Sequence, residues 1–165
     1  MKTQPTTEPL SSLVLVTALV AGVALIAAAE QSNPSLWDLA RKEAKTHRFS
    51  TLFTAHDVRN ILSGEAGLAN AIDWCKRTAV SQVYIECFRD GYQAERGALT
   101  NSIARFRAAG IGVSGCVTPT QVGKSSTGWK DTISCYTDRP TQERLRAIFE
   151  YAASLADETM IDDFW

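Results

Sequence analysis

Two adjacent carboxylates, Asp162 and Asp163, are the residues of this sequence best suited to carry chemistry. They follow the apolar residues Thr159 to Ile161 in a segment that has the composition of a strand. In parallel α/β proteins, side chains at the carboxyl ends of strands face the ligand site. A carboxylate there can act as a general acid, a general base or a nucleophile, as in the cleavage of a glycosidic bond. Neighbouring strand residues point to opposite faces, so we expect one Asp to be functional and the other structural.

Further polar residues follow two earlier apolar segments of the chain. Glu86, Arg89 and Asp90 end one segment, and His56 and Asp57 end another. A Glu inside an apolar strand is costly to bury unless it is paired, and Arg89 is the predicted partner. We therefore expect Glu86, Arg89, Asp90 and His56 either to bind substrate or to shape the rim of the site.

A long connection, residues 118–137, separates the third apolar segment from the helix expected after it. Long loops without their own secondary structure are usually functional. Trp129 lies in this loop and could stack on a sugar ring. Gly123-Lys124-Ser125 resembles a phosphate-binding loop only superficially, because the glycine that should precede it by five residues is replaced by Thr118.

The elements that would position these residues alternate between strand and helix. The expected strands are short apolar runs, as in a parallel sheet covered on both faces, and the helices show apolar spacing of about 3.6 residues. Units of this size predict right-handed βαβ crossovers. The predicted strands cover 48–56, 82–88, 111–117 and 158–164; the predicted helices begin near Ser63, Ala94 and Asp138.

Residues 1–35 differ from the rest of the chain. Leu13 to Ala29 carry no charge, and Ala27-Ala28-Ala29 fit the small-residue rule for signal cleavage. The stretch is also just long enough for an uncleaved membrane anchor. We therefore expect a secreted or periplasmic protein, or alternatively one anchored in a membrane and facing outside, with its globular domain in residues 36–165.

Composition excludes some partners. The formal net charge of −1 gives no reason to expect nucleic acid as a ligand. The spacing of the four cysteines does not predict a metal site, and no cofactor is expected. We expect buried free thiols; if any pair forms a disulfide, Cys116 and Cys135 are the best candidates because they bracket one loop.

Several segments together resemble the first half of glycoside-hydrolase-like (β/α)8 barrels found in secreted bacterial proteins. The resemblance covers roughly residues 48–165, and its segments are FTAHDVRNIL, VYIECFRDGYQAERGAL, GIGVSGCVTPTQVGKSSTGW, ISCYTDRPTQERLRAIF and ETMIDDFW. It implies that Asp162 and Asp163 are catalytic candidates at the end of the fourth strand. It also implies four further strand–helix units after Trp165. This chain alone is therefore expected to be inactive and to self-associate through open sheet edges.

The combined prediction is an α/β fold, half of a TIM barrel with about four strands, from an enzyme that hydrolyses O-glycosidic bonds. The alternative is a degenerate barrel that binds carbohydrate without cleaving it. A third hypothesis is a metal-dependent deacetylase-like barrel with His56, Asp57 and the Asp pair as ligands. It lacks the paired histidines of such a site, because the sequence contains two histidines in all.

Overall fold

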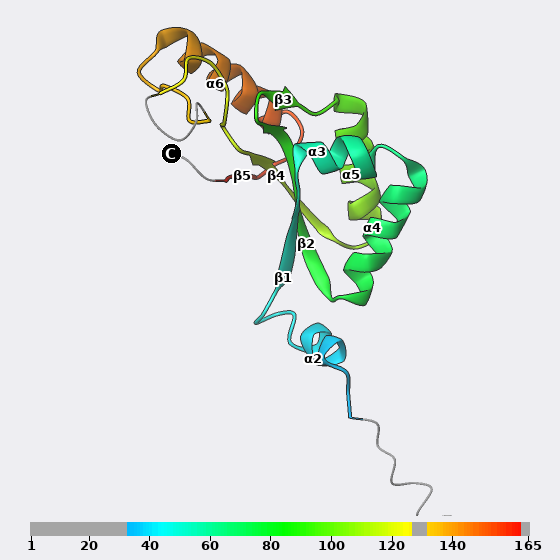
Figure 1. Ribbon diagram of the computed structural model, residues 1–165. Helices are drawn as coiled ribbons and strands as arrows, with labels where there is room; N and C mark the ends of the chain where they lie inside the picture. The colour runs from blue at the N-terminus through cyan, green and yellow to red at the C-terminus, as the bar shows by residue number, and fades with distance from the viewer. Residues whose placement is uncertain (1–32, 127–131, 163–165) are drawn as a thin grey trace, which may run out of the picture. The chain divides into compact units, whose positions relative to one another are not determined.

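The computed structural model describes residues 33–126 and 132–162. They form an α/β fold, in which helices alternate with the strands of a mainly parallel β-sheet (Figure 1). All the elements below belong to the unit Ser35–Trp165. Four strands pair in parallel in the order β1-β2-β4-β5. Their bounds are Phe49–Phe53 for β1, Val80–Arg89 for β2, Gly112–Val117 for β4 and Thr159–Ile161 for β5.

Helices connect successive parallel strands, so the sequence forms repeated βα units. Figure 1 shows α4 and α5 together on one side of the sheet. Asp138 caps α6 by accepting a hydrogen bond from Thr141 N, and Pro140 lies in the first turn of that helix. The helical segments are α2 (Leu36–Lys42), α3 (Ala55–Asp57), the π-helix η1 (Val58–Leu62), α4 (Glu65–Arg77), α5 (Arg96–Ala108) and α6 (Arg139–Ala153).

The two faces of the sheet differ in character. Val83 and Ile85 of β2 point to the helices and join the main apolar core with Phe106 of α5. Burying such side chains contributes roughly 1.5–3 kcal/mol each. Tyr84 and Glu86, which alternate with them along β2, point the other way. We call this second face the inner face, because it would line the interior of a closed barrel.

A polar layer crosses the inner face toward the amino ends of the strands. Gln82 Nε2 donates to Ser114 Oγ at 2.9 Å, and Ser114 Oγ donates to Glu158 Oε2 at 2.6 Å. These residues come from β2, β4 and the residue before β5. Layers of side chains from neighbouring strands also fill the interior of a (β/α)8 barrel. The described sheet therefore has the organisation of part of such a barrel.

The predicted strands and helices are confirmed, with corrections at the ends of elements. His56 and Asp57 do not end a strand: β1 ends at Phe53, and both residues lie in α3. The reason is a capping box in which Thr54 and Asp57 satisfy each other's backbone N–H groups. Residues 92–93 form β3, a two-residue strand antiparallel to β2, and this hairpin was not predicted.

Gly67 in α4 allows a close approach to η1. A Cβ built on Gly67 would overlap the carbonyl oxygen of Ile61. Gly67→Ala is therefore expected to lower the free energy of unfolding by about 1–3 kcal/mol, although Ala is normally the better helix former. Urea denaturation would check this. Asn70→Ala, at an exposed position of the same helix, is the control and should be neutral or slightly stabilising; equal effects of the two substitutions would contradict the close approach.

All four cysteines are free thiols, so the structure does not contain the Cys116–Cys135 disulfide. Burial raises the pKa of Cys75 to about 11. It also raises the pKa of Cys87 and of Cys116 to about 12. For Cys135, a hydrogen bond with the Thr137 hydroxyl lowers the pKa instead.

These thiols should differ sharply in reactivity, because the thiolate is the nucleophile. At pH 8 an aromatic disulfide reagent is expected to modify Cys135 quickly and the other three only after unfolding in denaturant. Mass mapping of the labelled peptides would identify the sites. Rapid labelling of Cys116 in the folded protein would contradict the buried position of that residue.

Within residues 33–126 and 132–162, no helix is long and apolar enough to cross a bilayer. The apolar stretch Leu13 to Ala29 lies outside the described residues, so a signal peptide or an anchor stays a prediction.

Candidate functional site

Glu86, Arg89, Thr118 and Asp162 form a polar cluster at the carboxyl edge of the sheet. Glu86 lies at its centre. Its side chain is completely buried. Oε2 accepts hydrogen bonds from Ala55 N at 2.8 Å and from Arg89 Nε at 2.9 Å. Oε1 accepts from the Thr118 hydroxyl and from Arg89 Nε. Both oxygens are therefore used, and Glu86 ties the end of β1 to the ends of β2 and β4.

Arg89 links Glu86 to Asp162. The pairing between β2 and β4 is irregular between Glu86 and Phe88, and Arg89 lies beyond this irregularity with its guanidinium on the inner face. Nη2 donates to Asp162 Oδ2 at 2.8 Å and to Thr118 Oγ1 at 3.0 Å. One cation thus holds two carboxylates from strands far apart in the sequence.

The guanidinium of Arg89 is held firmly in its charged form. Partial burial opposes the charge, but the hydrogen bond and the charge of Glu86, together with Asp162, raise the pKa of Arg89 above its ordinary value. A buried carboxylate and a nearby cation offset each other's desolvation cost. Arg89 makes its hydrogen bonds to other residues of the protein. Its role in substrate binding stays a prediction.

Asp162 is the carboxylate of the Arg89 ion pairs that reaches solvent. Its backbone N–H donates to Val117 O at 3.0 Å, which continues the pairing of β4 with β5. The side chain is 29% exposed, and its hydrogen bonds with described residues all involve Oδ2. Oδ1 accepts no hydrogen bond from the residues that the structure describes.

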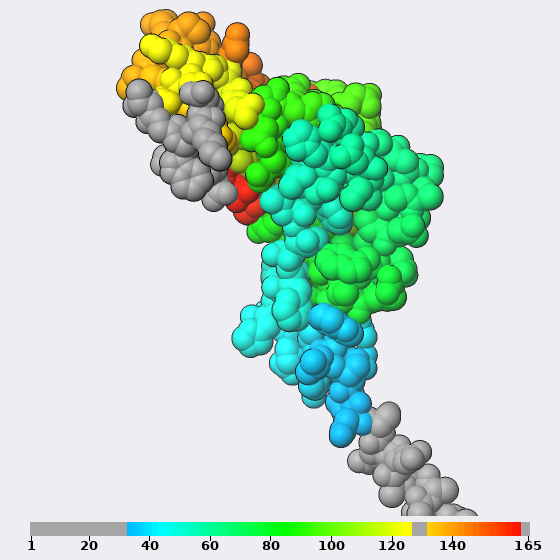
Figure 2. Space-filling model, viewed as in Figure 1, coloured from blue at the N-terminus to red at the C-terminus, as the bar shows by residue number. Residues whose placement is uncertain are grey.

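The loop after β4 begins beside this cluster. Thr120 Oγ1 donates to Asp90 Oδ1 at 2.8 Å and accepts from Asp90 N at 2.9 Å. Asp90 and Gly91 both have positive φ angles, which form the tight β2–β3 turn. Figure 2 shows the segment after β4, in yellow, against the residues of β2 and β3, in green. The start of this loop therefore lies at the edge that carries Glu86 and Asp162.

His56 lies in a separate aromatic group. Its ring stacks on Tyr92 with 5.3 Å between ring centroids, and Arg59 lies 4.8 Å from the same Tyr ring centroid. Nδ1 of His56 is buried without a hydrogen-bond partner among the described residues. Because His56 and Arg59 already contact the Tyr92 ring, this group resembles rim packing more than an open stacking platform.

Two predicted site residues, Trp129 and Asp163, lie outside the described residues, and their roles stay predictions. No group of three or more His, Cys, Asp or Glu side chains within residues 33–126 and 132–162 is placed to hold a metal ion. Asp57, a ligand in the deacetylase-like hypothesis, accepts hydrogen bonds from Thr54 N and Thr54 Oγ1 instead. The described residues thus give the metal hypothesis no support.

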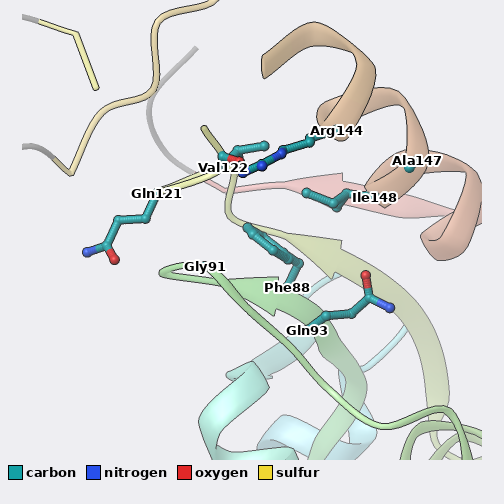
Figure 3. Close-up of a pocket in the computed structure, with 8 residues that line it drawn as sticks. All are labelled: Phe88, Gly91, Gln93, Gln121, Val122, Arg144, Ala147 and Ile148. Carbon is teal, nitrogen blue, oxygen red and sulfur yellow. Dashed lines mark hydrogen bonds between the residues drawn. The ribbon is translucent and has the colours of Figure 1, made fainter. Parts of the chain in front are cut away.

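A cavity of about 360 Å³ lies between the β2–β3 hairpin, the loop after β4 and α6 (Figure 3). Phe88 and Ile148 supply apolar walls, and Arg144 lies across the rim. Phe88 belongs to the helix-side core, whereas Arg89 next to it faces the inner side. The lining residues are Phe88, Gly91, Gln93, Gln121, Val122, Arg144, Ala147 and Ile148.

Comparison with known proteins identifies the family. Residues 32–165 match the family described as "Probable glycosyl hydrolase, catalytic domain". The chain belongs to this family. Membership agrees with the parallel sheet of βα units and with a carboxylate at its carboxyl edge, and glycosyl hydrolase domains act on carbohydrate.

One curated relative is an uncharacterized protein of Saccharolobus solfataricus, 24% identical over 127 residues. The match covers 73% of this chain and 20% of that protein, so the chain spans about a fifth of the relative's length. No solved structure matches significantly.

Sequence reasoning missed two features of this region of the structure. The hydroxyls of Thr118 and Thr120 were not singled out, although they directly follow a strand in a run of hydroxyl residues. The Arg144 cavity was also missed, because it combines residues from three distant segments. An exposed Arg in a helix gives no signal of this kind in a single sequence.

Proposed function

We propose that the chain contributes to an enzyme that hydrolyses O-glycosidic bonds at the carboxyl edge of the sheet, with Asp162 as a catalytic carboxylate. The observation that supports this most is the difference between the two carboxylates of the cluster: Asp162 is partly exposed and Glu86 is buried. Arg89 fixes one oxygen of Asp162, while the other oxygen has no hydrogen-bond partner among the described residues and the side chain is partly exposed. Glu86 is buried and both of its oxygens already accept hydrogen bonds, so we assign it a positioning role.

The ion pair between Asp162 and Arg89 favours an Asp162 that acts as a carboxylate anion. A carboxylate in that state can attack the anomeric carbon as a nucleophile or activate water as a general base, and it stabilises an oxocarbenium-like transition state. Cleavage also needs a second carboxyl group that protonates the leaving oxygen. The candidate for this acid is a residue on another strand of the completed barrel, because neighbouring strand residues such as Asp162 and Asp163 face opposite sides.

We further propose that additional strands complete the barrel. The pairing order leaves one side of β1 and one side of β5 without a strand among the described residues. Open edges promote association, and the Saccharolobus relative is much longer than this chain. Four more βα units, in the same polypeptide, would cover both edges and the inner face. Export directed by residues 1–35 would place the enzyme outside the cell, where polysaccharides occur.

A second candidate function is carbohydrate binding without cleavage. It is favoured by one observation: of the two carboxylates paired with Arg89 in the described residues, Asp162 reaches solvent and Glu86 is buried. A site with a single accessible carboxylate could hold sugar hydroxyls without completing acid/base chemistry.

The native gene product would distinguish these functions. Its intact mass would show whether the polypeptide extends past Trp165. Incubation with a panel of polysaccharides and aryl glycosides should then release reducing sugar or phenol, with rates that depend on protein concentration. Saturable binding without any release would support the binding function, and neither binding nor release would refute both.

A further inference from the structure

Arg144 is a cation at the rim of the cavity, and no acidic residue among those that the structure describes pairs with it. Its Nη1 donates to Val122 O at 3.2 Å, which holds the guanidinium in place. Two residues further along α6, Arg146 is paired with Glu150 at 2.7 Å. No carboxylate among the described residues forms such a pair with Arg144, so its Nε–H and Nη2–H groups remain available. This planar edge matches the two oxygens of a carboxylate.

The other walls of the cavity suit a sugar ring. Figure 3 shows Phe88 and Ile148 pointing into the space beneath Arg144, with Gln93 at the lower side and Gln121 pointing away. Apolar walls can contact the C–H face of a pyranose, and the Gln93 amide can bond a hydroxyl group. The volume of about 360 Å³ lies at the small end of ligand sites. No lining residue carries a negative charge that would repel an anion.

We propose that this cavity binds one acidic sugar unit, a pyranose that bears a carboxylate. The carboxylate pairs with Arg144, and the ring lies against Phe88 and Ile148. The inference rests on the proposed carbohydrate function and adds that the saccharide is a polyuronate or carries uronic acid branches. Because Phe88 and Arg89 face opposite sides of β2, the cavity is an accessory binding site separate from the cluster of Asp162.

Isothermal titration of the native protein with single compounds tests this proposal. The probes are sodium glucuronate, sodium galacturonate, glucose and sodium sulfate at constant ionic strength. We expect at least one uronate to bind at least about tenfold more tightly than glucose and sulfate, because charge-assisted hydrogen bonds add to ring contacts. Arg144→Gln should weaken uronate binding by at least about tenfold. Arg146→Gln, the matched control on the same helix, should leave it unchanged.

The outcomes separate this inference from the proposed function. No uronate binding, equal binding of sulfate or glucose, or an Arg144→Gln variant with unchanged affinity and melting temperature would each overturn the acidic-sugar site. Uronate binding that depends on Arg144, without cleavage of any glycoside, would refute the hydrolase proposal alone. Cleavage of neutral glycans without uronate binding would refute the cavity proposal alone.

Discussion

Replacing Asp162 with Asn in the native protein is expected to lower kcat for glycoside hydrolysis by about a thousandfold or more, equivalent to about 4 kcal/mol of transition-state stabilisation. The amide keeps the shape of the side chain and can still accept a hydrogen bond from Arg89. It cannot supply the negative charge that a nucleophile, a base or an oxocarbenium-like transition state requires. Steady-state kinetics on an aryl glycoside that the wild type cleaves would measure the loss.

Two further variants make this result specific. Asp157→Asn is the matched control, because Asp157 precedes β5 but its side chain is 98% exposed and paired only with Arg107 in the described structure; its kcat should be unchanged. Asp163→Asn should behave differently from Asp162→Asn, since neighbouring strand residues face opposite sides. Wild-type turnover in both Asp162→Asn and Asp163→Asn would remove the pair from catalysis and favour the binding function.

Removing Glu86 is expected to have the largest effect on stability. Glu86→Ala would leave Arg89, Thr118 and the Ala55 amide without their shared acceptor in a buried position. Breaking a buried ion pair from one side costs about 3–5 kcal/mol. Urea denaturation of the full chain, followed by circular dichroism, would give the change in the free energy of unfolding.

The milder Glu86→Gln variant covers the case in which Glu86→Ala does not fold. Gln keeps one acceptor oxygen but loses the charge, so its loss of stability should be smaller and still exceed about 1 kcal/mol. Glu65→Ala is the surface control, because Glu65 is 73% exposed in its pair with Arg105; we expect a change below about 1 kcal/mol. A Glu86→Ala variant as stable as Glu65→Ala would show that the cluster does not hold the strand ends together.

The sequence predicts the repeating part of this fold well, because periodicity is a local property. Gly110 ends α5 with a φ angle of +80°, which few residues other than glycine adopt easily. Asp138 and Pro140 likewise mark the start of α6 through capping chemistry that is visible in the sequence. The predicted pairing of Glu86 with Arg89 also follows from local reasoning, since a Glu in an apolar strand needs a nearby cation.

Features that depend on register or on distant segments could not be predicted. The choice between the faces of Asp162 and Asp163 requires the phase of a short strand end, which Thr118 and Arg89 reveal only in three dimensions. The capping box of Thr54 and Asp57 starts a helix at Ala55, although the β-rich composition of residues 48–56 favours a strand there. The β2–β3 hairpin was missed because Asp90-Gly91 continued an expected strand–helix connection, although Asp-Gly is a common turn sequence.

The central claim is that sugar is cleaved at Asp162, at the carboxyl edge of the sheet. The most direct test is a crystal structure of the full-length Asp162→Asn variant, which should be inactive, in complex with an oligosaccharide that the wild type hydrolyses. We expect the scissile bond to lie beside the side chain at position 162, with Arg89 still bonded to Glu86 and Thr118. A saccharide bound at the amino ends of the strands, away from position 162, would contradict the account.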